Sequence, residues 1–199
     1  MNVVTANPPL SFHERPIGRL TVEKYEAMVA SGNITEDDRL ELIEGALLEK
    51  MGKRERHATG SAKTGLAIAR VLPSGWHVRH DNPVRIPNRD SEPEPDISVA
   101  RGVPDDYIEH HPGPEDLALV VEVSLWTLQA DRALAETYIG GGVPVYWLLN
   151  LRDRQLEVYT PANSEPAILA ANEFVDLVIA SVSAGRITVA DLLPKATEE

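Results

Sequence analysis

The most apolar stretch of the chain covers residues 117–123, in which Glu122 is the one charged residue. Its length and its β-branched residues predict a central strand that is buried on both faces. Alternation along that strand would place Val120, Glu122 and Ser124 on one face of a sheet. Other apolar runs bounded by turn residues predict strands at 46–51, 76–80, 84–86, 96–100, 145–149 and 155–160, with short strands around Gly185.

Apolar residues at helical spacing predict the helices. The longest covers 56–72 and is ended by Pro73-Ser74-Gly75. Thr21 is expected to cap a helix that ends near residue 31, because acidic residues follow it in the first turns. A short helix is predicted from Thr35 through Leu42, and another over 128–140, before a run of three glycines.

The order of these elements predicts an α/β (α+β) fold in which a mixed β-sheet is flanked by helices. Residues 1–18 contain Pro8, Pro9 and Pro16 with little periodicity, and we expect them to form a flexible N-terminal arm. Residues 19–199 are expected to form a single domain, because the chain is short enough for one domain with an arm.

Composition narrows the class of protein. The 199 residues are 43% hydrophobic, but no apolar run is long enough to span a membrane, and no secretory signal is visible. The chain has no cysteine, which excludes disulfides and thiolate metal sites and fits a cytoplasmic protein. The net charge of −12 counts against tight nonspecific binding to DNA, although a local basic patch is compatible with it.

Two acidic residues occupy positions that are costly for a charge. Glu122 lies inside the apolar central strand, where an ionised carboxylate needs compensation, and Asp96 opens another apolar strand after Pro95. Glu122 could pair with a structural arginine or cap a loop, and Asp96 could be a turn residue. If neighbouring strands bring the two together, their repulsion favours a bound cation, and oxygen ligands without cysteine suit Mg²⁺ or Mn²⁺.

A series of segments in this order resembles the Uma-two-type restriction endonucleases: Leu20-Thr21-Val22-Glu23-Lys24-Tyr25, Glu41-Leu42-Ile43-Glu44-Gly45, His57, Pro95-Asp96, Val121-Glu122-Val123-Ser124, Asp131-Arg132, Tyr138 and Gly142-Val143-Pro144-Val145-Tyr146-Trp147. The resemblance implies membership of the PD-(D/E)XK nuclease superfamily, with a restriction-endonuclease-like sheet, magnesium dependence and phosphodiester hydrolysis. It makes Asp96 the motif aspartate, Glu122 the motif glutamate, and Glu41 a helical glutamate that can join the metal shell.

The chain departs from the superfamily at the motif lysine. Ser124 stands where that lysine is expected, and a compensating lysine on the following helix is replaced by Ala135. Arg132 is the remaining cation of that helix, so Ser124 and Arg132 complete the candidate catalytic set with Asp96, Glu122 and Glu41. Loss of one stabilising donor costs about 10²–10³ in rate in other enzymes, so such a site could be slow without being inactive. Arg56 or Lys63, from the long helix, could also reach the site.

Several other residues have two interpretations each. Lys53, Arg54 and Arg56 form the densest basic stretch, which is either a contact for DNA phosphates or a solvated hairpin. His57 is a surface or capping histidine or, by the resemblance, lies near the scissile phosphate. Trp126 either packs or closes the pocket.

Tyr146-Trp147 belongs to the core, or to a homodimer surface if it is exposed. We expect the protein to form a homodimer and to bind DNA, and we expect no association with a membrane.

Three functions remain open at this point. The first is a metal-dependent endonuclease that uses water as the nucleophile. The second is a nuclease-fold protein without catalysis that acts in binding or oligomerisation, and the third is an interaction protein without a metal. All depend on whether Asp96 and Glu122 become neighbours facing a common pocket.

Overall fold

The computed structural model describes residues 18–50, 52 and 54–196. The predicted N-terminal arm lies almost wholly outside the described residues, as does Lys53. The elements in chain order are α1 (Val22–Ala30), the 3₁₀ turn η2 (Glu36–Asp38), β1 (Leu40–Ile43), β2 (Ala46–Glu49), α2 (Glu55–Val71), β3 (Trp76–His80), η3 (Pro87–Arg89), β4 (Ile97–Arg101), η4 (Pro104–Tyr107), β5 (Leu117–Ser124), α3 (Leu128–Gly140), β6 (Tyr146–Asn150), β7 (Gln155–Tyr159), β8 (Ala167–Ala170), β9 (Phe174–Ile179), β10 (Val182–Thr188) and α4 (Val189–Leu192).

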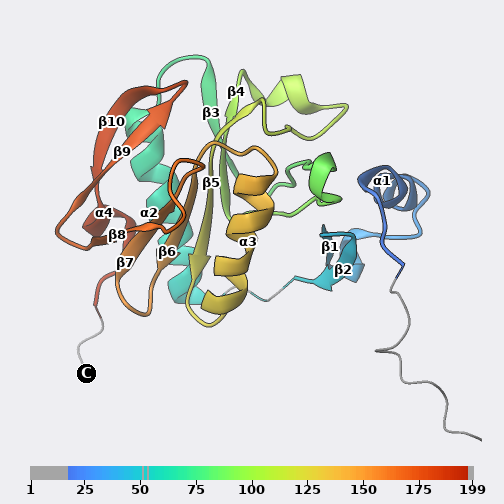
Figure 1. Cartoon of the computed structure of the whole chain (residues 1–199), viewed down its shortest axis with the longest axis horizontal. Helices are drawn as coiled ribbons and strands as arrows, with labels where there is room; N and C mark the ends of the chain where they lie inside the picture. The colour runs from blue at the N-terminus through green and yellow to red at the C-terminus, as the bar shows by residue number, and fades with distance from the viewer. Residues whose placement is uncertain (1–17, 51, 53, 197–199) are drawn as a thin grey trace, which may run out of the picture.

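A six-stranded mixed sheet in the order β3-β4-β5-β6-β7-β8 forms the centre of the molecule (Figure 1). β5 and β6 are parallel, and the other neighbouring pairs of this sheet are antiparallel. Helix α3 connects β5 to β6, as a parallel pair requires a crossover. The predicted class, a mixed sheet flanked by helices, is therefore confirmed.

The two faces of the sheet are covered by different elements, α2 on one and α3 on the other (Figure 1). The α2 face also receives the β9–β10 hairpin and α4, and its core includes Ile68, Val121 and Trp147. The α3 face packs Val120, Tyr138 and Leu148 into a second core. Among the described residues, no helix has the length and apolar character that crossing a bilayer requires.

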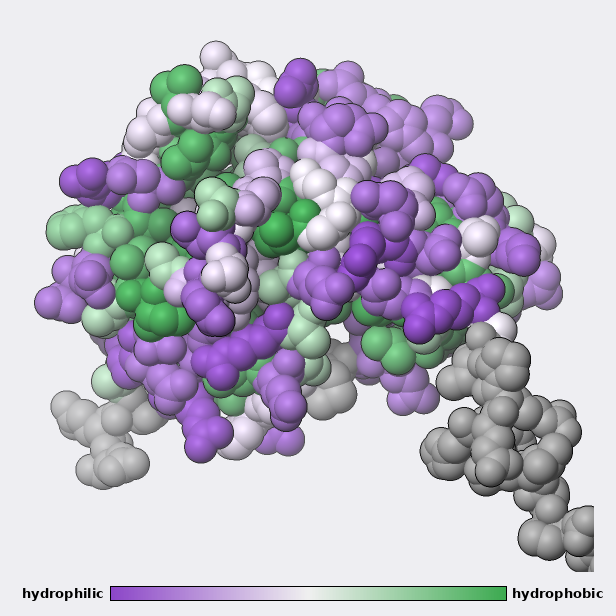
Figure 2. All heavy atoms as spheres, in the orientation of Figure 1, coloured by the Kyte–Doolittle hydropathy of each residue, from purple (hydrophilic) through white to green (hydrophobic). Residues whose placement is uncertain are grey.

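Helix α1 and the β1–β2 hairpin form a small lobe beside the sheet, on the right of Figure 1. Its own core contains Val22, Tyr25 and Leu42. The hydroxyl of Tyr25 donates to the carbonyl of Leu40 at 3.1 Å, which ties the helix to the hairpin. Hydrophilic residues dominate the visible surface of this lobe, whereas apolar residues gather on the opposite side, over β9 and β10 (Figure 2).

Two predicted elements are wrong. The helix expected from Thr35 through Leu42 is a single 3₁₀ turn that ends at Arg39 in the left-handed region, followed by strand β1. The strand forms because Glu44 and Gly45 both have positive φ, 48° and 76°, and so make a tight hairpin that pairs β1 with β2. The strand expected at 84–86 is reduced to one bridge between Ile86 and Ser91.

The aromatic pair expected in the core or in a dimer surface lies in the core. Tyr146 and Trp147 are 0% and 1% exposed, on opposite faces of β6. The argument for a homodimer from exposed aromatic residues therefore no longer holds. Strand β8, at the edge of the sheet, was not predicted from the sequence.

Candidate metal and nuclease site

Strands β4 and β5 bring Asp96 and Glu122 side by side. Ile97 pairs with Val121, so the residue before Ile97 comes opposite Glu122. The backbone N–H of Asp96 donates to Glu122 Oε2 at 3.4 Å. The two carboxylates thus lie next to each other at the end of the sheet. The shared site inferred from the sequence requires them to be neighbours.

Asp96 is held by two neighbouring elements. Its Oδ2 atom accepts the backbone N–H of Val123 at 2.8 Å and lies 3.0 Å from Nε2 of His57, in the first turn of α2. The side chain of Asp96 is only 5% exposed and that of His57 is 18% exposed. The structure therefore places His57 directly against Asp96, and this position is deeper than a surface cap would be.

Glu122 has a different kind of environment. The buried hydroxyl of Tyr138, two turns along α3 from Asp131, donates to Glu122 Oε1 at 2.9 Å. Burial raises the pKa of Glu122 well above its ordinary value, and the charges of Asp96 and Asp131 raise it further. In the described part of the chain, no lysine or arginine forms an ion pair with Glu122. The site therefore favours either a proton or a bound cation.

Asp131 is a third acidic residue at this place, and the sequence analysis did not select it. Burial raises its pKa, while the hydroxyls of Thr127 and Ser124 lower it. Thr127 Oγ1 donates to Asp131 Oδ2 at 2.5 Å. The shared helical face of residues 131 and 138, directly after the strand of Glu122, was a signal that could have identified both Asp131 and Tyr138.

Ser124, at the position where the resemblance led us to expect a lysine, is 1% exposed and lies two residues beyond Glu122 on the same face of β5. The structure therefore puts a small neutral hydroxyl next to the acidic residues. It gives the carboxylates no positive charge.

Glu41 lies on strand β1, which corrects its expected place on a helix. Its Oε2 atom accepts the backbone N–H of Glu94 at 3.1 Å, and burial raises its pKa. The neighbouring Glu94 side chain is ion-paired with Lys50. Glu41 thus lies on the lobe, across from the β4–β5 carboxylates.

Arg132 does not reach the acidic pair in the described structure. Its Nε and NH2 atoms donate to the two carboxylate oxygens of Glu157 on β7, at 2.9 and 2.6 Å. The reason is that Glu157 is 1% exposed and requires a counter-charge on the α3 face. In this arrangement Arg132 neutralises the charge of Glu157. The geometry gives no support to the expectation that Arg132 completes the catalytic set.

The basic stretch before α2 is divided between surface and interior. Arg54 is exposed and lines a cleft that Asp96 also lines. Arg56 is half-buried at the start of α2, and Lys53 lies outside the described residues.

An open cleft of about 1250 Å³ is lined by residues of the lobe, of β5 and of α3. Its walls contain Glu41, His57, Asp96, Glu122 and Asp131. Among the described lining residues ten are Asp or Glu and three are Lys or Arg, so the cleft is strongly acidic. Such a cleft would attract cations in preference to phosphates.

The residues present fit a hard divalent cation by their chemistry. The carboxylates of Asp96 and Glu122, on two adjacent strands, have Asp131 beside them, and the pKa values of Glu122 and Asp131 are raised. Mg²⁺ or Mn²⁺ would relieve their mutual repulsion. Across residues 18–50, 52 and 54–196, no three acidic or histidine side chains already converge closely enough to form a finished ligand set. Binding of an ion would therefore require these side chains to come closer together.

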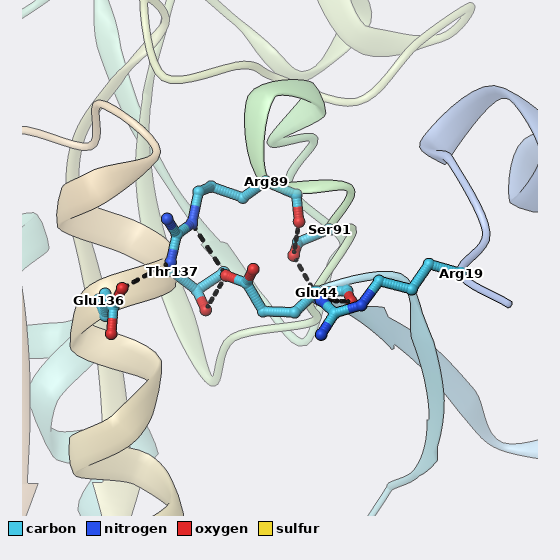
Figure 3. A network of polar contacts seen from close by, with 6 residues as sticks. All are labelled: Arg19, Glu44, Arg89, Ser91, Glu136 and Thr137. Atoms are coloured by element: carbon cyan, nitrogen blue, oxygen red, sulfur yellow. Dashed lines mark hydrogen bonds and ion pairs between the residues drawn. The ribbon is translucent and has the colours of Figure 1, made fainter. Parts of the chain in front are cut away.

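A polar network holds the lobe against α3 (Figure 3). Glu44, in the β1–β2 turn, accepts from Thr137 Oγ1 and from Arg89 Nε, both at 2.9 Å. Arg89 also pairs with Glu136 at 3.1 Å, and Ser91 Oγ accepts the backbone N–H of Glu44 at 2.8 Å. We call Glu44, Arg89 and Thr137 the clamp. It fixes the strand that carries Glu41 relative to the helix that carries Asp131.

A mixed sheet with helices on both faces, and an acidic pair on adjacent strands at an open cleft, define a restriction-endonuclease-like protein. One solved structure with this fold is described as a putative nuclease belonging to DUF820 from Anabaena variabilis; it has a TM-score of 0.67 and 18% sequence identity, and the match covers 87% of this chain and 97% of that one. A search of curated proteins gave no match. The chain belongs to the Uma2 family, described as "Putative restriction endonuclease", whose model matches residues 22–189.

Proposed function

We propose that the protein is a metal-dependent endonuclease that hydrolyses phosphodiester bonds in DNA, with Mg²⁺ or Mn²⁺ held by Asp96 and Glu122 and supported by Glu41. The single observation that carries the proposal is the pair of adjacent carboxylates at the cleft, in which Glu122 has acidic neighbours and no arginine or lysine partner among the described residues. A carboxylate that is only structural would be expected to have such a partner.

The chain's own residues prepare this site in three ways. Tyr138 orients Glu122 through its hydroxyl, and the Val123 N–H and His57 orient Asp96. Thr127 and Ser124 favour the charged form of Asp131 beside the pair. When bound, the ion would neutralise the negative charge that develops around phosphorus and would make water a better nucleophile.

A second candidate, a nuclease-fold protein that binds without cleaving, has one observation in its favour. Ser124 occupies the position of the superfamily lysine, and Arg132 is engaged by Glu157. The proposed endonuclease would therefore be slow, because one preorganised donor contributes about 10²–10³ in rate elsewhere. We also propose that the protein acts in the cytoplasm, which the lack of cysteine in its sequence fits.

Nicking of a supercoiled plasmid in the presence of Mg²⁺ or Mn²⁺ tests the proposal. We expect the wild type to nick slowly, and Asp96→Ala and Glu122→Gln each to lose at least about 100-fold in rate. Asp176→Asn is the matched control, because this exposed carboxylate pairs with Arg186 on the β9–β10 hairpin, outside the cleft. Equal nicking by the wild type and Asp96→Ala would remove the enzymatic proposal as drawn, because Asp96 would have no part in it. No nicking by either would leave the binding module as the better account.

A further inference from the structure

Trp126 lies at the edge of the acidic cleft with its indole ring largely in water. The residue is 74% exposed and lines the same cleft as Asp96, Glu122 and Asp131. It occupies the β5–α3 loop, four residues after Glu122. This exposure contradicts the interpretation that Trp126 packs, whereas the interpretation that it closes the pocket stays a prediction. An aromatic side chain of this size next to a nuclease site suggests a contact with the substrate.

The backbone around Trp126 is fixed on both sides. Leu125 packs against the core on the α2 face of the sheet, and Thr127 is hydrogen-bonded to Asp131. The carbonyl of Ser124 accepts the N–H of Leu151 at 2.9 Å, which anchors the start of the loop. A ring carried by such a segment loses little conformational entropy when a flat ligand stacks on it.

The charge of the cleft limits how a nucleic acid can be held there. Ten acidic residues against three basic ones among its described lining residues mean that phosphates gain little attraction from these walls. Stacking of a base on an aromatic ring contributes about 1–3 kcal/mol per base and does not depend on charge. In a duplex, however, each base is already covered by its neighbours. The contact therefore requires an unpaired base.

Resting on the proposed function, we infer that Trp126 is a stacking platform for an unpaired base beside the scissile phosphodiester, so that the preferred substrate is single-stranded or locally unpaired DNA. The platform selects the strand state of the substrate and takes no part in the chemical step. Because every base has a flat face, it confers little sequence preference.

Binding of a fluorescently labelled oligothymidylate of about ten nucleotides, in EDTA so that no cleavage occurs, tests the inference with the full chain. We expect Trp126→Ala to weaken single-strand binding about 5- to 150-fold, equally at low and high salt, and Trp126→Phe to retain most of the affinity. Binding of a duplex of equal length should change little. Phe174→Ala is the control, because this aromatic residue is 57% exposed on β9, outside the cleft.

Tryptophan fluorescence gives an independent readout of the same contact. The strand should quench the wild-type emission, and Trp126→Phe should lose this quenching, because Trp147 is 1% exposed and Trp76 lies on β3 outside the cleft. Unchanged single-strand affinity in Trp126→Ala, an equal loss for the duplex or an equal loss in Phe174→Ala would overturn the inference. Tighter binding of a ribo-oligonucleotide would overturn the assignment to DNA.

The two proposals can fail separately. Trp126-dependent binding without any plasmid nicking would remove the nuclease and retain the platform. Nicking of fully paired DNA that Trp126→Ala leaves unchanged would remove the platform and retain the nuclease.

Discussion

Glu122 and Glu157 are two glutamates on the same face of the same sheet, and the protein treats them in opposite ways. The register aligns Glu122 with Leu148 and Leu148 with Glu157, so only one strand separates them. Glu157 receives two hydrogen bonds from Arg132, one from Tyr159 and one from Asn150, and these donors lower its pKa despite burial. Glu122 receives one from the hydroxyl of Tyr138 and a longer one from the backbone N–H of Asp96, both uncharged donors. It has acidic neighbours, and its pKa is raised.

The comparison teaches how to separate a structural charge from a functional one. Glu157 shows that this fold can supply a buried carboxylate with a full set of donors, including an arginine. The incomplete set of donors around Glu122 is therefore a local property of the cleft, because the same face of the sheet gives Glu157 a full set. A site that leaves a charge without compensation keeps that interaction available for a ligand.

The largest expected effect is stabilisation of the folded protein by the metal. At a concentration of 100 times its dissociation constant, Mg²⁺ should add about 2.7 kcal/mol to the free energy of unfolding. Glu122→Gln should lose most of this gain, whereas Glu157→Gln should keep it. Thermal unfolding with and without Mg²⁺ measures both. A gain retained by Glu122→Gln would mean that the two glutamates do not differ in the way we describe.

The next effect is the loss of stability in Glu157→Gln. Arg132 and Tyr159 would keep a partner of the same shape, but the charge that holds Arg132 would be gone. Hydrogen bonds to charged groups contribute about 1.5–3 kcal/mol, and since the Arg132 side chain is 46% exposed we expect the lower half of this range. Denaturant unfolding at neutral pH without metal gives the value. No loss at all would show that the Arg132 network is not structural.

The sequence predicted the sheet well because its central strand is continuous and apolar, and it predicted the acidic pair because charges in such strands are costly. It failed where a choice depended on partners that are distant in the chain. The segment 35–42 has no decisive periodicity, and the Glu44-Gly45 turn makes it a strand. Arg132 was expected to reach the acidic pair, and its pairing with Glu157 could not be predicted because that residue, 25 positions further on, is brought beside it only by the fold.

Removal of the Glu122 charge should change the free energy of unfolding by less than Glu157→Gln does, and in the opposite direction. In the metal-free protein, Glu122→Gln should raise the free energy of unfolding at pH values above 4.5, on the order of 1 kcal/mol. The folded-state pKa of Glu122 lies above its ordinary value of 4.5, so the folded protein binds more protons, and stability falls as the pH rises through this window. Glu157 has a lowered pKa, so its contribution is present above about 4.5 and is lost as the pH falls.

The pH dependence must be taken as a difference between variants, because other groups contribute. Burial raises the pKa of Glu92 to about 7, which gives the wild type a slope of the same sign as that from Glu122. Denaturant unfolding gives the free energy of unfolding of the wild type and of Glu122→Gln at each pH. The difference between the two values isolates the contribution of Glu122. A difference that does not grow between pH 4.5 and neutrality would contradict the raised pKa.

Glu44 provides an intermediate case, a carboxylate that is 35% exposed and held by the clamp. Thr137→Val removes one of its donors without changing the shape of the buried side chain, and should cost about 0.5–1.5 kcal/mol in the free energy of unfolding. Thr59→Val is the matched control, because its hydroxyl bonds only within α2, to the carbonyl of Glu55. A cost as large as that of Glu157→Gln would contradict the weaker contribution that we expect from a partly exposed carboxylate. The clamp would then support more of the fold than the position of the lobe.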